Sequence, residues 1–273
     1  MIKFVIIVAF EPVMSRLLRV VHTALKQDFN VLVVDNSEKN PLQNVFQNDN
    51  VFLISLNNNR GIAYAQNIGV DFCESKGANI ITFLDQDSLI TENMLLLLEE
   101  TVTCNYNCVA CPVSIDEVKG TEYPSHRINK YGLMKNIFSQ NVNTLVEVDI
   151  AISSGMTMSI QTFNLIGYFD EDFFIDFVDI DWCLRARKIL VKILVVPDSV
   201  MLHRIGEKTV SFGFLNFNQH APIRTYYKVR NSFILLRKKY NIVFCLRQII
   251  SAVVHNFIII FIFKENEYIY LKL

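Results

Sequence analysis

Short apolar runs alternate with amphipathic stretches over the first 90 residues of the chain. Residues 15–27 place leucines and valines on one helical face, and residues 61–76 form a second helical stretch that stops at Gly77. Strands that alternate with helices predict βαβ units and a mostly parallel, Rossmann-like α/β sheet flanked by helices. The four apolar runs that predict strands are Phe4–Phe10, Val31–Val34, Val51–Leu56 and Ile80–Leu84.

Polar residues follow each of the four predicted strands. The first strand leads into Glu11, the second into Asp35 and Asn36, the third into an asparagine-rich loop, and the fourth into Asp85 and Asp87. Because the carboxyl ends of parallel strands share one edge of a sheet, these residues are expected to meet in one ligand-binding crevice. Because loops are polar in any protein, the four polar strand ends together indicate a binding site more strongly than any one of these residues does.

The segment FLDQDS, residues 83–88, ends a buried strand on two carboxylates. Neither G-x-G-x-x-G after the first strand nor G-x-x-x-x-G-K-[ST] occurs, so a glycine-rich loop is not the phosphate anchor. Mg²⁺ and Mn²⁺ bridge carboxylates and phosphates. We therefore expect a divalent cation held by Asp87, with Asp85 beside it, to anchor a nucleotide diphosphate.

A second acidic cluster lies among aromatic residues between positions 149 and 181. Buried carboxylates are costly unless they have partners. Residues 179–187 have the pattern of a helix start, and the i, i+4 spacing of Asp181 and Arg185 favours an ion pair for Asp181. Asp179 stands at the helix N-terminus, where a carboxylate can meet a ligand, and is the candidate general base.

Basic and polar residues after position 200 extend the candidate site. His203 follows an apolar run, and both a metal or phosphate contact and a hydrogen-bonded core position are open for it. Arg224 and Arg230, in RTYYKVRN, carry planar donor groups suited to phosphate, although a solvated helix face is an equal alternative.

Three cysteines, Cys104, Cys108 and Cys111, have the C-x₃-C-x₂-C spacing of radical-enzyme iron–sulfur sites. The context argues against a cluster, because four predicted strands precede it and Val109–Val113 has the pattern of an edge strand after a helix at Glu92–Val102. No signal peptide is expected at the N-terminus, so the six cysteines are expected to be free thiols in a reducing cytoplasm.

Composition adds a question about membranes. The 26 basic and 27 acidic residues nearly cancel, so nucleic acid is not an expected partner. Hydrophobic residues make up 51% of the chain, yet polar residues interrupt the most apolar stretch, 242–263, so no transmembrane helix is expected. This stretch follows the basic triplet 237–239. A buried core helix and a helix lying on anionic lipid are both open.

Together these motifs resemble the inverting glycosyltransferase family 2, which has the GT-A fold. Within that family, DQDS and FFIDFVDIDWC resemble bacterial rhamnosyltransferases of surface-polysaccharide, including O-antigen, biosynthesis. The resemblance implies a catalytic domain over residues 1–240, with a nucleotide-sugar half at about 1–115 and an acceptor half at about 116–240. An apolar helical segment would follow at 241–273. The matching segments are VVDNS (33–37), NRGIAYAQNIG (59–69), FLDQDS (83–88), ISSGMTMS (152–159), IGYFDEDFFIDFVDIDWCLRAR (166–187), HRIG (203–206) and RTYYKVRN (224–231).

The resemblance implies a role for each matching residue. Asp179 would be the general base, and Asp87 and His203 would hold Mg²⁺ or Mn²⁺. The residues implied to bind the donor are Asp35, Asn36, Asn59, Gly61, Asn67, Asp85, Gln86, Arg224 and Arg230. Those implied to bind the acceptor are Ser154, Gly155, Asp176, Asp181 and Trp182.

The resemblance also implies the partners. The donor would be dTDP-L-rhamnose, and the acceptor an undecaprenyl-diphosphate-linked oligosaccharide on the cytoplasmic face of the membrane, which the protein would contact peripherally. Glu11 departs from the family's asparagine at the end of the first strand. Three alternatives remain: a family-2 enzyme that uses a UDP- or GDP-sugar, a sugar-phosphate nucleotidyltransferase, whose G-x-x-T-R-like loop this chain lacks, and a non-catalytic scaffold.

Overall fold

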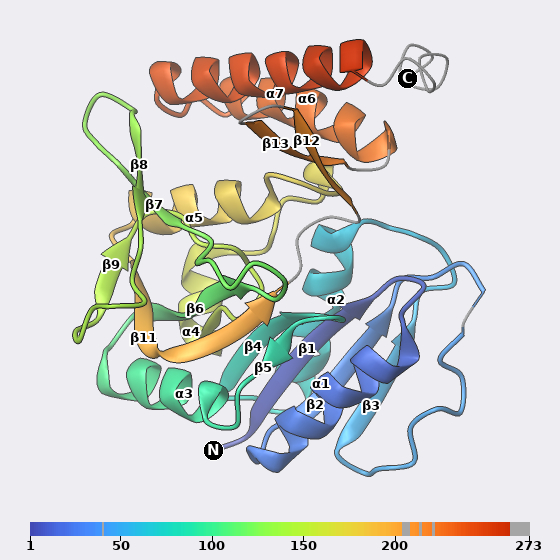
Figure 1. Ribbon diagram of the computed structural model, residues 1–273. Coiled ribbons are helices and arrows are strands. Elements are labelled where there is room, and N and C mark those ends of the chain that lie inside the picture. The colour runs from blue at the N-terminus through green and yellow to red at the C-terminus, as the bar shows by residue number, and fades with distance from the viewer. Residues whose placement is uncertain (40, 204–207, 213–214, 220–221, 263–273) are drawn as a thin grey trace. The chain divides into compact units, whose positions relative to one another are not determined.

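The computed structural model describes residues 1–39, 41–203, 208–212, 215–219 and 222–262 (Figure 1). The chain divides into two compact units. The first unit comprises Met1–Arg127, Asn136–Asp172 and Val178–Arg204. The second comprises Ile128–Lys135, Phe173–Phe177 and the described residues within Ile205–Leu273. This division groups the described residues between 205 and 240 with the C-terminal helices and not with the first unit.

The first unit is built on one mixed, mostly parallel sheet. Its strand order is β3-β2-β1-β4-β10-β6-β11-β5, and β9 also pairs with β11. Strand β10 runs antiparallel between β4 and β6, whereas β1, β2, β3 and β4 are mutually parallel. The predicted α/β class is confirmed. The strands are β1 (Lys3–Ala9), β2 (Asn30–Asp35), β3 (Val51–Ser55), β4 (Ile80–Asp85), β5 (Leu89–Ile90), β6 (Cys108–Asp116), β9 (Val146–Val148), β10 (Thr157–Ser159) and β11 (Lys192–His203).

Helices cover both faces of this sheet. Alternate residues of a strand point to opposite faces, so Val5 and Ile7 of β1 join the core beneath α1 and α3. On the other face α2 approaches closely, because a Cβ on Gly69 would lie 2.5 Å from Ile6 Cγ2. The helices are α1 (Met14–Lys26), α2 (Ile62–Ser75), α3 (Met94–Cys104), α4 (Ile160–Ile166) and α5 (Val178–Lys188).

An aromatic cluster joins α4 and α5 to the second face of the sheet. Phe83 of β4 packs edge-on against Phe169, with ring centroids 5.2 Å apart. Phe163 of α4 stacks on Trp182 of α5 at 5.9 Å. Both Phe163 and Trp182 are fully buried, so this cluster fixes α5 against the sheet.

Strand β6 corrects the prediction of an edge strand at Val109–Val113. It lies inside the sheet between β10 and β11, and all nine of its residues are buried. Pro112 has no N–H to donate, which normally excludes proline from such a strand. Here the β6–β11 register shifts between Val196 and Val200, next to Pro112, so an irregularity in the partner strand accommodates the missing donor.

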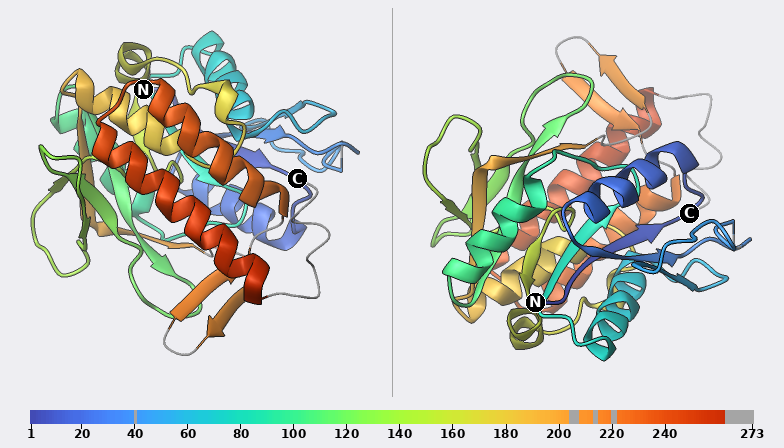
Figure 2. Two further views of the ribbon diagram at one scale, coloured as in Figure 1. Left: turned by 90° about the horizontal axis from the view of Figure 1, so that it is seen from above. Right: turned by 90° about the horizontal axis from the view of Figure 1, so that it is seen from below.

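The second unit contains two long helices, α6 (Pro222–Arg237) and α7 (Ile242–Ile262), which lie side by side (Figure 2). Helix α7 confirms the predicted helix at 242–263, and its last predicted residue lies outside the described residues. In the described chain, no helix is both long enough and apolar enough to cross a membrane. The unit also contains the strands β12 (Lys208–Phe212) and β13 (Leu215–Gln219).

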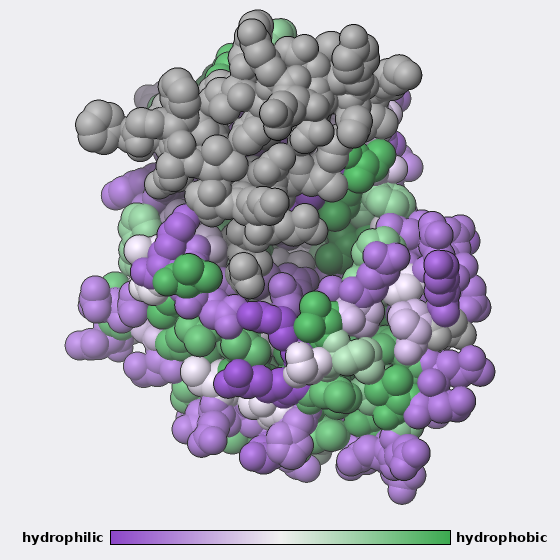
Figure 3. Space-filling model, turned by 45° about the vertical axis from the view of Figure 1, so that its right-hand side comes forward, coloured by the Kyte–Doolittle hydropathy of each residue, from purple (hydrophilic) through white to green (hydrophobic). Residues whose placement is uncertain are grey.

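Two smaller elements complete the described chain. Strands β7 (Ser125–Ile128) and β8 (Met134–Ile137) form a two-stranded ribbon, and a short 3-10 helix spans Glu171–Phe173. On the face shown in Figure 3, hydrophilic residues lie between and beside the apolar areas.

Candidate active site

The ends of three neighbouring strands bring two predicted site residues to one edge of the sheet. Strand β1 lies between β2 and β4, and its last residues pair with Asp35 on one side and Asp85 on the other. Asp35 is opposite Ala9, and Asp85 is opposite Val8. The two carboxylates therefore flank the same strand end, as the pattern of strand ends predicted.

Asp35 is fully buried and has an unsatisfied acceptor. Its Oδ1 accepts the Ser37 N–H at 3.0 Å. Its Oδ2 is buried and has no hydrogen-bond partner among the described residues. A buried oxygen without a donor is costly to leave unpaired. The site is therefore suited to a ligand that brings an N–H or O–H group to this oxygen.

Asn36, Asn59 and Gly61 form one hydrogen-bonded loop beside Asp35. The Asn36 amide donates to Asn59 Oδ1 at 3.1 Å, and its oxygen accepts the Arg60 N–H at 2.8 Å. Asn59 Oδ1 also accepts the Gly61 N–H. Gly61 has φ +84°, a conformation that glycine adopts without strain, and α2 begins directly after it. These three residues shape the edge of the site.

Gln86 holds the loop that follows β1. Its side-chain oxygen accepts the Phe10 N–H at 2.7 Å, and its amide nitrogen donates to the Phe10 carbonyl at 3.1 Å. The next residue, Glu11, has φ +45° and donates its N–H to Ser37 Oγ. The loop carrying Glu11 is thus fixed from both neighbouring strand ends.

His203, at the end of β11, lies near Asp85. His203 Nε2 is 3.8 Å from Asp85 Oδ2, and the Asp85 side chain is one-third exposed. On its other side, His203 Nδ1 lies 3.2 Å from Ser88 Oγ, and Ser88 Oγ lies 2.9 Å from Ser154 Oγ. Ser154 Oγ accepts the Asp85 N–H. This buried hydroxyl chain fixes the imidazole so that Nε2 faces Asp85. The remainder of the HRIG motif, residues 204–206, lies outside the described residues.

Asp116, at the end of the neighbouring strand β6, and Tyr123, in the segment after it, lie beside His203. Asp116 is opposite His203 in the β6–β11 register. The hydrogen bond from the Tyr123 hydroxyl, at 2.6 Å, lowers the pKa of Asp116 below its usual range. The Tyr123 ring packs edge-on against the imidazole, with centroids 6.3 Å apart.

Asp87 lies in the turn after β4, next to an ion pair. The Asp87 carbonyl accepts a hydrogen bond from Arg16 at 3.4 Å. Arg16 also pairs with Glu117 at 2.8 Å, and the Glu117 N–H donates to the His203 carbonyl. Arg16 therefore connects α1 with the Asp87 turn directly and with His203 through Glu117.

The donor atoms fit a metal whose coordination is completed by substrate. Among the described residues, no three His, Cys, Asp or Glu side chains gather into a full ligand set. Asp85 and His203 nevertheless offer an oxygen and a nitrogen close together. Mg²⁺ bound with a nucleotide takes one or two carboxylates from the protein and its other ligands from phosphates and water.

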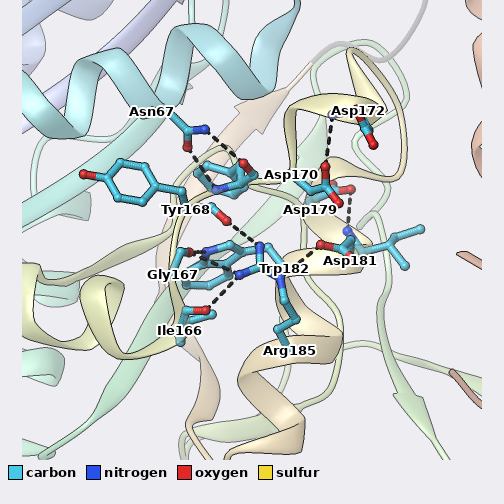
Figure 4. A network of polar contacts seen from close by, with 12 residues as sticks. Asn67, Ile166, Gly167, Tyr168, Asp170, Asp172, Asp179, Asp181, Trp182 and Arg185 are labelled. Atoms are coloured by element: carbon cyan, nitrogen blue, oxygen red, sulfur yellow. Dashed lines mark hydrogen bonds and ion pairs between the residues drawn. The ribbon is translucent and has the colours of Figure 1, made fainter. Parts of the chain in front are cut away.

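Asn67 joins α2 to the segment before the second acidic cluster. Its amide donates to the Phe169 carbonyl at 2.9 Å, and its oxygen accepts the Phe169 N–H at 2.9 Å. A further bond reaches Glu171. Asn67 is buried, and Figure 4 shows it turned toward this backbone. These contacts give Asn67 a role in holding the loop.

Helix α5 presents Asp179 and buries its next two predicted site residues (Figure 4). Asp179 is half-buried in the first turn, and its Oδ1 accepts the Ile180 N–H at 2.8 Å. Asp181 is fully buried and pairs with Arg185 at 3.1 Å, which is the ion pair favoured from its spacing. Trp182 is also fully buried and donates its indole N–H to the Gly167 carbonyl. The structure thus places both Asp181 and Trp182 in the core.

Gly155, just before β10, allows that segment to approach Pro112 of β6 closely. It has φ +88°, and a Cβ there would lie 2.4 Å from Pro112. Its N–H donates to the Phe83 carbonyl at 2.7 Å. Ser154 and Gly155 are thereby held beside the end of β4.

The remaining predicted residues lie in the second unit. Arg224 forms a bidentate ion pair with Asp176, with distances of 3.1 Å. The Arg230 guanidinium lies over the Tyr227 ring and donates to Asn231 Oδ1 at 3.0 Å. Asp176 and Arg224, predicted to bind the acceptor and the donor respectively, are thus paired with each other within the second unit.

Three residues with roles at the site were not singled out from the sequence. Ser88 links His203 to Ser154, Ser37 binds both Asp35 and Glu11, and Arg16 pairs with Glu117. Ser37 and Ser88 stand in the quoted segments VVDNS and FLDQDS, so their position just after a strand-end aspartate was the available signal. Arg16 had no such signal, because it lies in an ordinary amphipathic helix.

The six cysteines differ in exposure. All six are free, and Cys108 and Cys111 are buried, whereas Cys104 is exposed. Burial raises the pKa of the Cys108 thiol to about 11 and raises that of Cys111 further.

A family model decides the identity of the chain. The model described as "Glycosyl transferase family 2" matches residues 4–163. The chain belongs to glycosyltransferase family 2. It is also 36% identical to the dTDP-rhamnosyl transferase RfbF of Shigella flexneri, over 98% of this chain and 91% of that protein. The protein is therefore a glycosyltransferase.

More distant relatives agree with the family. The low-salt glycan biosynthesis hexosyltransferase Agl10 of Haloferax volcanii is 27% identical over 58% of this chain and 53% of its own length. GalNAc-T7, solved with UDP, GalNAc and Mn²⁺, superimposes with a TM-score of 0.64 at 15% identity, over 84% of this chain and 48% of that chain. Residues 1–349 of S. aureus TarS, solved with UDP-GlcNAc, give 0.59 at 18% identity, over 94% and 73%. These likenesses show the fold, and the predicted GT-A fold is confirmed.

Proposed function

We propose that this glycosyltransferase transfers L-rhamnose from dTDP-L-rhamnose, with inversion at the sugar carbon, to a lipid-linked oligosaccharide of surface-polysaccharide assembly. The observation that supports dTDP-L-rhamnose as the donor is the 36% identity to a dTDP-rhamnosyl transferase along nearly the whole chain. The carboxylates at the β1 edge support the chemistry.

Asp35 binds the nucleoside in this proposal. Its buried, unpaired Oδ2 is suited to the N3–H of a thymine base, which is a hydrogen-bond donor. The same donor exists on uracil, so Asp35 alone does not select thymidine. Asn36, Asn59 and Gly61 hold the loop next to it and keep the carboxylate in place.

In this proposal Asp87 and His203, with Asp85 beside them, would hold Mg²⁺ or Mn²⁺ together with the donor diphosphate. Nε2 is the imidazole nitrogen that faces Asp85, since Nδ1 is engaged by Ser88. When bound, the cation neutralises charge that develops on the departing diphosphate. The buried Ser88–Ser154 pair keeps the imidazole oriented as the donor enters.

Asp179 acts as the general base. The acceptor hydroxyl oxygen forms a bond to the sugar C1, and the bond from C1 to the diphosphate oxygen breaks with its electron pair leaving on dTDP. The hydroxyl proton passes to the Asp179 carboxylate. This side chain lies in the first turn of α5 and is only half-buried. Such base catalysis contributes about 10²–10⁴-fold to the rate.

A lipid-linked acceptor calls for contact with a membrane surface, and α7 carries a face suited to it. Residues 222–262 contain seven basic residues and no acidic one: Arg224, Lys228, Arg230, Arg237, Lys238, Lys239 and Arg247. An apolar stripe with helical spacing is exposed along α7, formed by Ile242, Leu246, Ile250, Val254 and Phe257. Apolar side chains flanked by basic ones favour peripheral binding to anionic lipid at the inner face of the cytoplasmic membrane.

A transfer assay tests the proposal. Release of dTDP from dTDP-L-rhamnose is measured with Mn²⁺ and extracted lipid-linked acceptor, for wild type, Asp179→Asn and the control Asp198→Asn. Asp198 is an exposed carboxylate on β11. We expect Asp179→Asn to lose about 10²–10⁴-fold in kcat and to retain donor binding, with Asp198→Asn unchanged. A full rate in Asp179→Asn would refute the assignment of the base, and turnover with UDP-glucose instead of the thymidine donor would refute the donor.

A further inference from the structure

The segment that leads into the base is backbone-strained. Phe174, Asp176 and Phe177 have φ values of 55°, 61° and 65°, in the left-handed region that non-glycine residues rarely occupy. Phe177 is followed directly by Val178, where α5 begins, and Asp179 lies one residue further. Three such residues in four positions persist only when the surroundings hold them in place.

Asn231 of α6 supplies much of that support. Its Nδ2 donates toward the carbonyls of Phe173, Ile175 and Asp176, at 2.7, 2.8 and 2.9 Å. Asn231 is fully buried, and its Oδ1 accepts from Arg230, which fixes the amide with its nitrogen toward the loop. An amide nitrogen has two hydrogens, so three carbonyl oxygens converge on a group that can satisfy two of them fully.

Two further residues on the same face of α6 hold the same loop. Arg224 pairs with the Asp176 carboxylate through both oxygens. Tyr227 stacks on Phe174, with centroids 4.7 Å apart and planes 13° from parallel. Arg224, Tyr227 and Asn231 are spaced i, i+3, i+7 and therefore lie on one face of α6. This face contacts the loop's carboxylate, its aromatic ring and its backbone carbonyls.

We infer that Asn231 is a positioning residue for the reaction, which fixes the loop Phe173–Phe177 and thereby the first turn of α5 with Asp179. This inference rests on the proposed role of Asp179 as base. Without the amide, three converging carbonyls lose their shared donor, and the left-handed residues relax toward ordinary conformations. Because a displacement of about 1 Å in a reacting group costs about 10²-fold in rate, the loss falls on kcat.

The test compares Asn231→Ala with Ser232→Ala. Ser232 is also fully buried on α6, but its hydroxyl donates to the Val229 carbonyl of the same helix. We expect Asn231→Ala to lower kcat by at least tenfold with the dTDP-L-rhamnose Kd within twofold of wild type. Ser232→Ala is expected to lower Tm by a comparable amount and to keep kcat within twofold. Asn231→Asp retains the side-chain volume and the acceptor for Arg230 but has no amide hydrogen, so it is expected to lose kcat as well.

A double-mutant cycle shows where the effect acts. In the Asp179→Asn background, Asn231→Ala is expected to reduce the residual rate by less than twofold, because the positioned base is already absent. A full tenfold loss in that background, or a loss of kcat that merely follows Tm in both α6 variants, would overturn the inference. If Asp179→Asn alone keeps the wild-type rate, the proposed base fails and the inference fails with it. If Asp179→Asn is slow and Asn231→Ala is not, only the inference fails.

Discussion

Polar side chains at the sheet edge fall into two groups. Asn36, Asn67 and Gln86 are engaged with neighbouring backbone, and they set the shape of the loops. Asp35 keeps a buried oxygen without a partner, and Asp85 and His203 face each other at 3.8 Å. The buried, unpaired Oδ2 of Asp35 has the property expected of a group that binds a ligand.

Ser88 orients the His203 imidazole through its hydroxyl. Ser88→Ala removes the hydroxyl that holds His203 Nδ1, so the imidazole is no longer fixed with Nε2 toward Asp85. Mn²⁺ affinity in the presence of dTDP is expected to fall by about 10–100-fold, as for other residues that orient metal ligands. Titration monitored by Mn²⁺ electron paramagnetic resonance measures this directly.

Thr82→Val is the matched control for Ser88→Ala. Thr82 is a fully buried hydroxyl of β4 whose partner is Thr157, within the sheet. It is expected to leave Mn²⁺ affinity unchanged. Equal affinities for wild type and Ser88→Ala would mean that the hydroxyl chain does not orient a metal ligand.

Elements differ in how well the sequence predicts them. Strands β1 to β4 and helices α1 and α2 were predicted within one or two residues, because each βα unit has a clear period and ends on polar residues. The sequence predicts an edge strand at Val109–Val113, after the helix at Glu92–Val102, whereas β6 lies inside the sheet. Its interior position depends on β11, which follows 75 residues later, and no local pattern specifies that pairing.

Site residues whose contacts join distant segments are likewise not predictable from local sequence patterns. The carboxylates after β2 and β4 were predictable because strand ends define where they lie. The contacts of Asn67 with Phe169 and of Asn231 with the loop before α5 join segments that are distant in sequence. Helical spacing did predict the pair of Asp181 with Arg185, since both residues lie on one helix.

Gly155 provides a prediction for the junction of β4, β6 and β10. Gly155→Ala forces a side chain into a left-handed position and against Pro112. The free energy of unfolding is expected to fall by more than about 2 kcal/mol, from strain and overpacking together. Gly120→Ala is the control, because it has φ +65° with nothing within 4 Å of the added Cβ. It is expected to cost about 1–2 kcal/mol from strain alone. Urea denaturation measures both, and equal losses would contradict the close packing at Gly155.

Charge is distributed unevenly over the whole molecule. The chain has 26 basic and 27 acidic residues, yet residues 222–262 hold seven basic and no acidic ones, which leaves 19 basic and 27 acidic residues elsewhere. The near-neutral total thus conceals a basic helical segment and an acidic remainder. The segregation is readable from the sequence, whereas the exposed stripe on α7 required the structure.

Vesicle binding tests the role of that stripe. The protein is expected to co-sediment with vesicles containing phosphatidylglycerol, and added salt is expected to weaken binding through screening of the basic residues. Ile250→Glu places a carboxylate in the middle of the exposed stripe and is expected to reduce binding by at least tenfold. Val118→Glu changes an exposed valine of the first unit and is expected to bind as wild type. Equal binding of the two variants would contradict lipid contact through α7.

The proposed function depends on a metal-dependent site for a thymidine-linked sugar at the β1 edge. Calorimetric titration of dTDP-L-rhamnose, with UDP-glucose and GDP-mannose as comparisons, with and without Mn²⁺, tests it on wild type and Asp87→Asn. We expect Mn²⁺-dependent binding of the thymidine donor in wild type and its loss in Asp87→Asn. Tight binding of another nucleotide sugar would agree with a glycosyltransferase but would contradict dTDP-L-rhamnose as its donor. If the folded protein binds no donor with Mn²⁺ present, the proposed transferase function is contradicted and a non-catalytic scaffold is favoured.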